Sequence, residues 1–275
     1  MNNAKRFTML VGTLFIGILV ASGCAGRGQA PSAEAGSDNV ITGELPDGGS
    51  LSVTLVEGVG NGATSLTQPA IDEPDFNRIS RPEHLCLELD GYALDVVVPV
   101  RWVCAIPVAE YESMNEAAAE QIDVLRNLLE TRPALSDHVG NLPDLPVPNA
   151  AQVMQSQPVY LEFASGAGLR YLTMHVQDFV PVTNQGLAYS FQGLTEDGAY
   201  IISVTLPVSH PSLPASLETL PDEVRLEMSM LGPDDYLNTY GPEAQALIDG
   251  LDPSEFAPTL MTLDDLVKSI SVSIP

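Results

Sequence analysis

The chain has 275 residues, of which 36 are acidic and 11 are basic, and its formal net charge is −25. Binding to nucleic acid depends on basic contacts to phosphate, so this composition argues against a nucleic-acid partner and against docking on anionic lipid headgroups. The acidic residues suggest calcium, but the sequence contains no D-x-[DN]-x-[DN]-G loop. Clusters such as Asp72, Glu73 and Asp75 are common in acidic proteins, and we therefore expect no metal site and no cofactor.

The N-terminus has the organisation of a secretory signal. Lys5 and Arg6 precede an uncharged apolar run at 7–22 (FTMLVGTLFIGILVAS), which is short for a membrane-spanning helix of roughly 17–25 residues. Small residues and Cys24 follow, and this arrangement resembles the lipobox of bacterial lipoproteins, in which the cysteine is lipidated and becomes the mature N-terminus. The alternative is an ordinary signal peptide, or an uncleaved anchor, in which Cys24 is incidental.

The lipobox resemblance implies an extracytoplasmic protein that is held on a bacterial membrane by acyl chains, and two or more chains give a stable anchor. With Ala25 rather than Asp after the cysteine, lipoprotein sorting would favour the outer membrane, if the organism has one. We expect a signal peptide at 1–23 and a flexible tether at 24–39, because the tether is mostly Ala, Gly, Ser and Pro. The remaining 252 residues would carry a net charge of about −27.

The folded part begins with a predicted β-hairpin, in which strands at 40–45 and 51–57 flank the turn signal PDGG. The following stretch contains Gly58-x-Gly60-x-x-Ala63, which formally matches a dinucleotide-binding fingerprint. The fingerprint requires a helix N-terminus next, but prolines and polar residues follow, so we interpret 58–74 as a loop. We therefore predict an N-terminal hairpin and loop at 40–79, followed by a larger domain at 80–275.

Two further cysteines lie in neighbouring predicted strands. Cys86 is in HLCLELDGY and Cys104 is in PVRWVCAIPV. An extracytoplasmic compartment permits disulfides, and adjacent strands can bring two Cα atoms within bonding range. A pair of buried free thiols is the alternative.

A helix is expected after the second cysteine, with a capping box formed by Ser113 and Glu116 and a proline stop at Pro133. Ile122, Leu125 and Leu129 supply its apolar face. A proline-rich loop at 140–148 and a short helical turn at 149–154 follow.

Four strands are predicted at 158–164, 169–177, 186–193 and 199–207, and their glycine-containing connections indicate an antiparallel meander. In the second of these strands, Leu172, Met174 and Val176 share one face. Tyr171, Thr173 and His175 share the other face, where Tyr171 and His175 are candidates to line a ligand pocket.

The last third returns to helix, at 223–231, 242–251 and from Thr262, before a terminal strand SVSIP. Strands flanked by helices without βαβ alternation predict the α+β class, with an antiparallel sheet of about four meander strands plus N-terminal strands, packed by helices. The sequence leaves open whether the N-terminal hairpin joins the main sheet or packs against it.

The run PNAAQV…YLEFASGAGLRYLTMHVQDFVPVTNQGLAYSFQGLTEDGAYIISVTLPVSHPSLP resembles a family of bacterial secreted proteins and lipoproteins that has no assigned activity. The resemblance extends to MNEAAAEQIDVLRNLL and to FAPTL…LDDLVKSISV, and it carries no functional residues. The meander followed by a final helix is more distantly similar to the α/β/α sandwich of PsbP-like proteins, which is an analogy of fold alone.

A search for catalytic motifs finds no G-x-S-x-G, H-E-x-x-H, P-loop or zinc-spaced Cys/His cluster, and the four histidines are scattered. We therefore expect no enzyme, but a noncatalytic lipoprotein that binds a protein partner or assists assembly in the cell envelope. Two alternatives are a binder of a small apolar or cationic ligand between sheet and helices, and a hydrolase whose catalytic residues meet only in space.

Overall fold

The computed structural model describes residues 39–75, 78–94 and 100–274. The predicted signal peptide, the tether up to residue 38 and the predicted lipidation site Cys24 lie outside the described residues. Within those residues, no helix is both long enough and apolar enough to cross a membrane.

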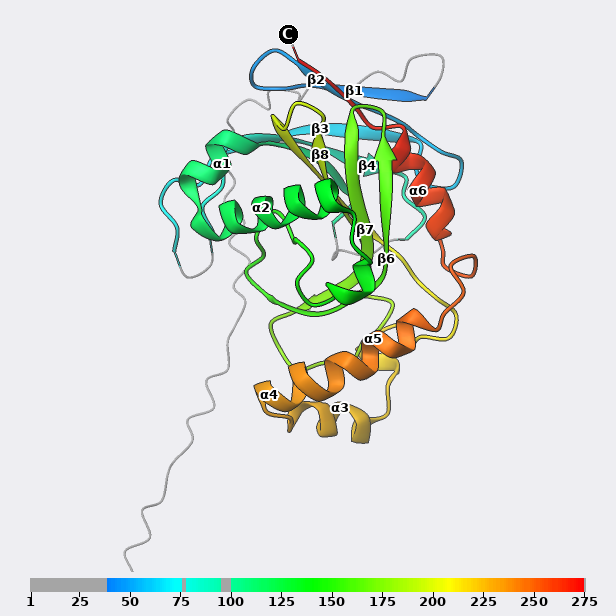
Figure 1. Ribbon diagram of the computed structural model, residues 1–275. Helices are drawn as coiled ribbons and strands as arrows, with labels where there is room; N and C mark the ends of the chain where they lie inside the picture. Colours follow the sequence, from blue (N-terminus) through cyan, green and yellow to red (C-terminus); the bar gives the residue numbers. More distant parts are fainter. Residues whose placement is uncertain (1–38, 76–77, 95–99, 275) are drawn as a thin grey trace, which may run out of the picture. The chain divides into compact units, whose positions relative to one another are not determined.

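The centre of the fold is a seven-stranded sheet in which every neighbouring pair is antiparallel (Figure 1). Along the sheet the order is β3-β4-β5-β9-β8-β7-β6. The strands are β3 (Gly62–Gln68), β4 (His84–Asp90), β5 (Trp102–Pro107), β6 (Ala151–Phe163), β7 (Gly166–Val176), β8 (Ala188–Thr195) and β9 (Tyr200–Pro207). Helices pack on this sheet, so the predicted α+β class is confirmed.

The predicted meander corresponds to β6–β9, and β9 returns to pair with β5. The first strand is longer than predicted, because β6 starts at Ala151 and bonds to the end of β7 through the pair Ala151 and Val176. The helical turn predicted at 149–154 is therefore wrong. Two register shifts in β6 interrupt the alternation that identifies a strand, which explains the error.

The N-terminal hairpin forms a second, smaller sheet. Its strands β1 (Val40–Glu44) and β2 (Ser50–Thr54) pair with each other, and the C-terminal strand β10 (Ser271–Ser273) pairs with β2 (Figure 1). Ile41, Leu51 and Val53 are fully buried and belong to the same apolar cluster as Leu85 of β4. The hairpin thus packs against the main sheet rather than joining it.

The stretch predicted as a loop at 58–74 contains β3, the edge strand beside β4. Its residues GATSLTQ are mostly polar and partly exposed, as suits an edge strand, and this composition hid the strand from pattern analysis. Because β3 and β4 belong to one sheet, the predicted boundary between residues 79 and 80 does not separate two structural units.

One face of the seven-stranded sheet is covered by α1 (Val108–Met114) and α2 (Glu116–Thr131) (Figure 1). Ser113 lies inside α1, and Asn115 caps α2 by accepting a hydrogen bond from the amide of Ala118 at 3.1 Å. The predicted Ser113–Glu116 capping box is therefore wrong, because a separate helix precedes α2. The buried positions of α2 are Ala118, Ile122, Leu125 and Leu128, whereas Leu129 is only partly buried.

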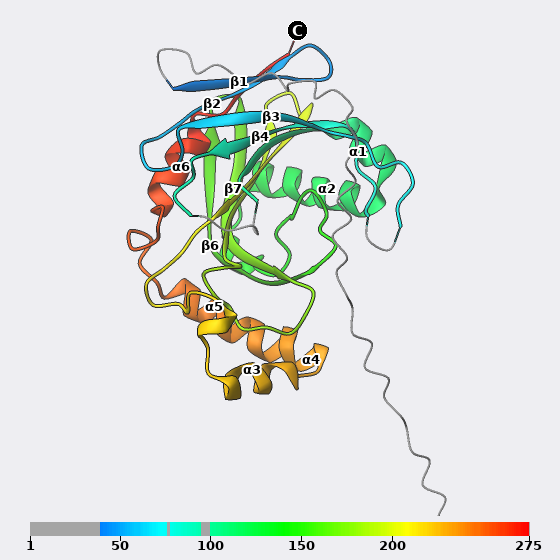
Figure 2. The same cartoon turned by 180° about the vertical axis from the view of Figure 1, so that it is seen from behind.

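The opposite face is covered by the small sheet and by α6 (Leu260–Lys268) (Figure 2). Thr259 caps α6, three residues before the predicted start. The remaining C-terminal helices form one neighbouring group, labelled α3 (Asp222–Ser229), α4 (Pro233–Asp235) and α5 (Gly241–Asp249) in Figures 1 and 2. A π-helical turn at Tyr236–Tyr240 joins α4 to α5.

The group is attached to the sheet through α5 and a bulge in β6. Gln157 lies in the left-handed region at φ 50°, and its amide donates to the Asp249 carboxylate at 2.7 Å. Its side-chain amide donates to the carbonyls of Ile248 and Leu251 at the end of α5.

Candidate functional site

The two cysteines predicted to pair are joined by a disulfide bond. Cys86 and Cys104 lie directly opposite each other in β4 and β5, and both are buried under the helical layer. A ring nitrogen of His84 lies within 4.8 Å of both sulfur atoms. Because the sulfurs are bonded to each other, they are not available as thiolate ligands, and the trio is not a metal centre in this state.

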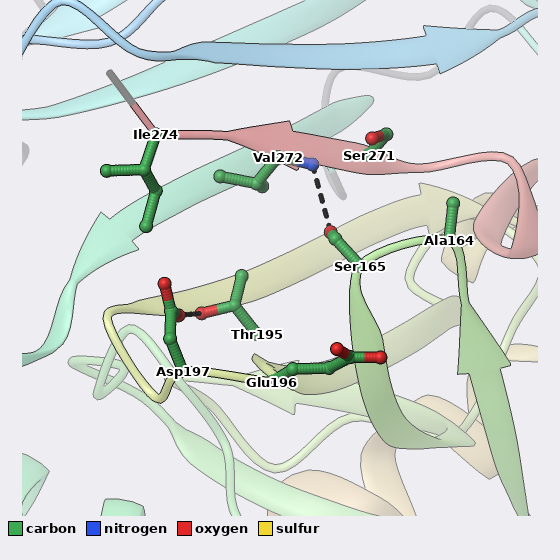
Figure 3. A pocket seen from close by; sticks show the side chains of 8 residues that line it. All are labelled: Ala164, Ser165, Thr195, Glu196, Asp197, Ser271, Val272 and Ile274. Carbon is green, nitrogen blue, oxygen red and sulfur yellow. Dashed lines mark hydrogen bonds between the residues drawn. The ribbon is translucent and has the colours of Figure 1, made fainter.

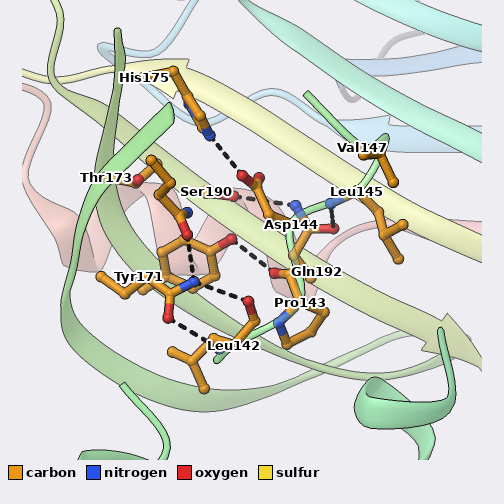
Figure 4. A network of polar contacts seen from close by, with 12 residues as sticks. Leu142, Pro143, Asp144, Leu145, Val147, Tyr171, Thr173, His175, Ser190 and Gln192 are labelled. Atoms are coloured by element: carbon orange, nitrogen blue, oxygen red, sulfur yellow. Dashed lines mark hydrogen bonds and ion pairs between the residues drawn. The ribbon is translucent and has the colours of Figure 1, made fainter. Parts of the chain in front are cut away.

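The most polar interior region lies between the sheet and α2, where residues 140–147 cross the sheet without regular structure (Figure 4). We call these residues the strap. Backbone groups buried without regular structure need other hydrogen-bond partners. Side chains from four strands of the sheet supply them.

Gln155 of β6 satisfies the first part of the strap. Its Oε1 atom accepts hydrogen bonds from the amides of Gly140 at 2.8 Å and Leu142 at 3.0 Å, and its Nε2 atom donates to the Leu142 carbonyl at 2.8 Å. Further along, Gln192 of β8 accepts from the amide of Leu145, and Ser203 of β9 donates to the Leu145 carbonyl. All three of these side chains are almost completely buried.

Tyr171 and His175, the predicted pocket residues, are also partners of the strap. The Tyr171 hydroxyl donates to the Pro143 carbonyl at 2.8 Å, and His175 Nε2 lies 2.6 Å from an Asp144 carboxylate oxygen (Figure 4). Tyr171 is fully buried, so it does not line an open pocket. The two side chains do share a sheet face as predicted, but the strap occupies the space above them.

Burial controls the ionisation of the tyrosines at this interface. Complete desolvation raises the pKa of Tyr171 well above its usual value, and the negative charge of Asp144 adds to the effect. Burial also raises the pKa of Tyr111 in α1, whose hydroxyl accepts a hydrogen bond from the amide of Val147 at 2.9 Å. Both phenols therefore stay neutral at physiological pH and act as hydrogen-bonding groups.

The His175–Asp144 pair has the geometry of an orienting carboxylate and a base, so a nucleophile must be sought. Among the described side chains, none forms a hydrogen bond with the other ring nitrogen of His175. Ser190, on the same face, accepts from the Gln192 side chain instead. The arrangement therefore fixes the strap and does not assemble an acyl-transfer triad.

A second concave region lies beside the C-terminal strand and has a volume of about 420 Å³ (Figure 3). Ser165 accepts a hydrogen bond from the amide of Val272 at 2.9 Å. Asp197 accepts one from the Thr195 hydroxyl at 2.6 Å, which holds the pKa of that carboxyl below its usual value. Glu196 also lines the hollow, which is thus acidic, and its lining residues include no histidine, cysteine or lysine.

The opposite face of the sheet holds one ion pair in an apolar environment. Arg170 of β7 lies 3.3 Å from Asp264 of α6, and the Tyr189 hydroxyl donates to the same carboxylate at 2.9 Å. The side chains of Arg170 and Asp264 are 6% and 15% exposed. This pair links α6 to the sheet and is not open to a ligand.

Sequence reasoning missed Gln155, Gln192 and Ser203, which satisfy the strap. The sequence showed only that these positions hold polar residues on the inward face of a strand. Buried polar side chains need hydrogen-bond partners, but the sequence did not identify those partners. Comparison of the chain with family models, curated proteins and solved structures found no match.

Proposed function

We propose that the protein is a noncatalytic extracytoplasmic lipoprotein that is anchored through Cys24 to a bacterial membrane, the outer membrane if one is present, and binds a protein partner of the cell envelope. The N-terminal pattern and the acidic composition support this proposal. The polar side chains between sheet and α2 also fit it, because they are engaged in holding the strap rather than in catalysis.

The observation that carries the proposal is the apolar surface of the helical group α3–α5. Met230 is 75% exposed, Leu226 is 61% exposed and Leu247 is 53% exposed, and Leu237 is exposed as well. Leu226 and Met230 are four positions apart on α3 and its C-cap, so they lie on the same side of the helix. Neighbouring exposed apolar side chains favour association with another surface. We call these four residues the apolar set.

The charges around the apolar set favour a protein over a membrane as its partner. The same helices carry Asp222, Glu223, Glu227, Asp234, Asp235, Glu243 and Asp249, against the single cation Arg225. Anionic lipid headgroups would be repelled by these carboxylates. A protein surface with an apolar centre and a basic rim complements both properties.

Site-specific crosslinking on the anchored protein tests the proposal. A photoreactive residue at Met230 should give one dominant adduct, which should disappear when Leu226→Asp is added. The matched control is Met261, which is 66% exposed on α6, away from α3 in both views (Figures 1 and 2). The same adducts from both positions, or an adduct that survives Leu226→Asp, would contradict the proposed surface.

The captured partner then needs to bind in isolation. With purified components, Leu226→Asp should weaken binding by about tenfold or more, because a charge would enter the apolar contact. Met261→Ser should leave the affinity unchanged. Equal effects of the two substitutions would contradict the assignment.

The anchor is tested separately by intact mass spectrometry of the membrane-extracted protein. We expect a mass corresponding to residues 24–275 plus acyl chains, and loss of acylation in Cys24→Ser. An unlipidated mature mass for the wild type would rule out the anchor.

A further inference from the structure

A pocket of about 370 Å³ lies beside the strap and α1, on a part of the molecule that the proposed partner surface does not use. It is lined by Ile71, Arg78, Arg81, Tyr111 and Val147, among others. Two arginines around one hollow are unusual in a chain with a net charge of −25.

Arg81 differs from the other cations that the structure describes. Arg78, Arg101, Arg126, Arg132, Arg170, Arg225 and Lys268 each have a carboxylate oxygen within 4.0 Å. Within the described ranges Arg81 alone has no such ion pair. Its Nε atom is buried and has no hydrogen-bond acceptor among the described residues.

An arginine that lines a pocket and has no carboxylate partner can pair with the anionic group of a ligand. Among the described residues, no acidic side chain lines this pocket. His84 has its pKa lowered by burial and by the charge of Arg81, so it is neutral at physiological pH. Tyr111 is a neutral phenol, as described above.

Tyr111 forms a fully buried part of the pocket wall. Its hydroxyl oxygen accepts the amide hydrogen of Val147. The positive charge of Arg81 acts on this phenol. Ile71 and Val147 add apolar wall to the same pocket.

We propose that this pocket binds a small organic monocarboxylate, whose carboxylate group pairs with Arg81 and whose apolar body packs against Ile71 and Val147. The planar guanidinium group matches a carboxylate through two parallel hydrogen bonds, which its two terminal Nη atoms would donate. A single charge is favoured over a multiply charged phosphate, because the protein as a whole repels anions. The volume is suited to a ligand of this size.

Calorimetric titration of the full chain in detergent with hexanoate and its uncharged analogue hexanamide tests the proposal. Hexanoate should bind with a dissociation constant of about 1 mM, as expected for a ligand of few atoms. Hexanamide should bind at least about tenfold more weakly, because it cannot form the charged pair. Equal affinities, or no detectable hexanoate binding, would overturn the proposal.

Two variants assign the binding to this pocket. Arg81→Gln should weaken hexanoate binding about tenfold, whereas Arg225→Gln, which removes an exposed arginine from α3, should leave it unchanged. Should Arg81→Gln fail to fold, Ile71→Trp keeps the arginine and fills the pocket from a partly exposed position. Unchanged binding in a folded form of either pocket variant would overturn the assignment.

Discussion

The two faces of the seven-stranded sheet are both buried, but they are covered in different ways. On one face, Phe191, Leu172 and Ile202 meet the hairpin and α6 in an almost continuous apolar cluster. On the other face, Gln155, Gln192 and other polar side chains meet the irregular strap as well as α1 and α2.

The difference follows from what covers each face. Helices and paired strands satisfy their own backbone groups, so the sheet beneath them needs only apolar side chains. The strap has no such internal pairing, so the sheet must present hydrogen-bonding side chains to it. The same sheet is therefore apolar or polar on each side according to the structure of its cover.

The largest loss of stability is expected when a large side chain is removed from the apolar face of the sheet. Phe191 is fully buried and meets Phe163 edge-on at 5.8 Å between ring centres, and a Cβ atom at Gly168 would lie 2.4 Å from its ring. Phe191→Ala should lower the free energy of unfolding by about 4 kcal/mol, through lost burial and a cavity. Urea unfolding measures this, and Phe191→Leu should lose about 1–2 kcal/mol because it keeps most of the volume. Equal losses would contradict the packing argument.

The next effect concerns the ion pair on the apolar face. Asp264→Ala leaves the buried guanidinium of Arg170 without its partner, which should lower the free energy of unfolding by about 3 kcal/mol. The neighbouring Asp265 is 54% exposed and pairs with Lys268, so Asp265→Ala should change stability by less than about 0.5 kcal/mol. Denaturant titrations at neutral pH compare the two; similar losses would show that the burial of the pair is unimportant.

A smaller and more local effect is expected on the polar face. Gln155→Leu removes the acceptor of the Gly140 and Leu142 amides and should lower the free energy of unfolding by about 2 kcal/mol. Hydrogen exchange should accelerate at those two amides first. Gln177→Leu, at an exposed glutamine, serves as the control and should leave their exchange unchanged. If amide exchange accelerated equally over the whole sheet, the Gln155 side chain would not be stabilising the strap locally, and the prediction would be wrong.

The smallest effect depends on pH and concerns the contact between the hairpin and the main sheet. Tyr200 donates to the Asp47 carboxylate at 2.7 Å, and this bond lowers the pKa of Asp47 in the folded state. Its stabilising contribution is complete above the ordinary Asp pKa of about 3.9 and is lost as the pH falls through the lower folded value. Asp47→Asn should remove this part of the acid sensitivity, which is below about 0.5 kcal/mol for such an exposed group. Unfolding curves of the variant and the wild type at several acidic pH values measure this difference. The same loss of stability with falling pH in both proteins would contradict the prediction.

Helices and strands could be predicted from the sequence where apolar residues repeat at a single spacing, either every second residue or at helical intervals. Leu172, Met174 and Val176 alternate with Tyr171 and Thr173, and the two sets lie on opposite faces as predicted. Helix α2 was recognisable because Ile122 and Leu125 repeat at helical spacing. The prediction failed at β3 and at the start of β6, where polar edge residues and bulges interrupt the period.

The candidate sites depended on contacts that periodicity does not encode. The partner of Gln192 is Leu145, 47 residues away in the chain, and it lies in a segment without regular structure. Likewise, Arg81 differs from the other described arginines because no described carboxylate lies within 4.0 Å of it, and the sequence alone does not show this distance. The disulfide between Cys86 and Cys104 could be predicted because the sequence already placed the two cysteines in neighbouring strands.

The pairing of β10 with β2 has a consequence for the order of folding. Ser271 lies opposite Ser52, so β2 is paired with a strand 219 residues further along the chain. Contacts between such distant residues carry a high loop-closure entropy and form slowly unless the intervening chain is already compact. The meander between them is built from local hairpins and can form early. The small sheet therefore completes late in folding, and one edge of β2 stays unpaired until β10 binds to it.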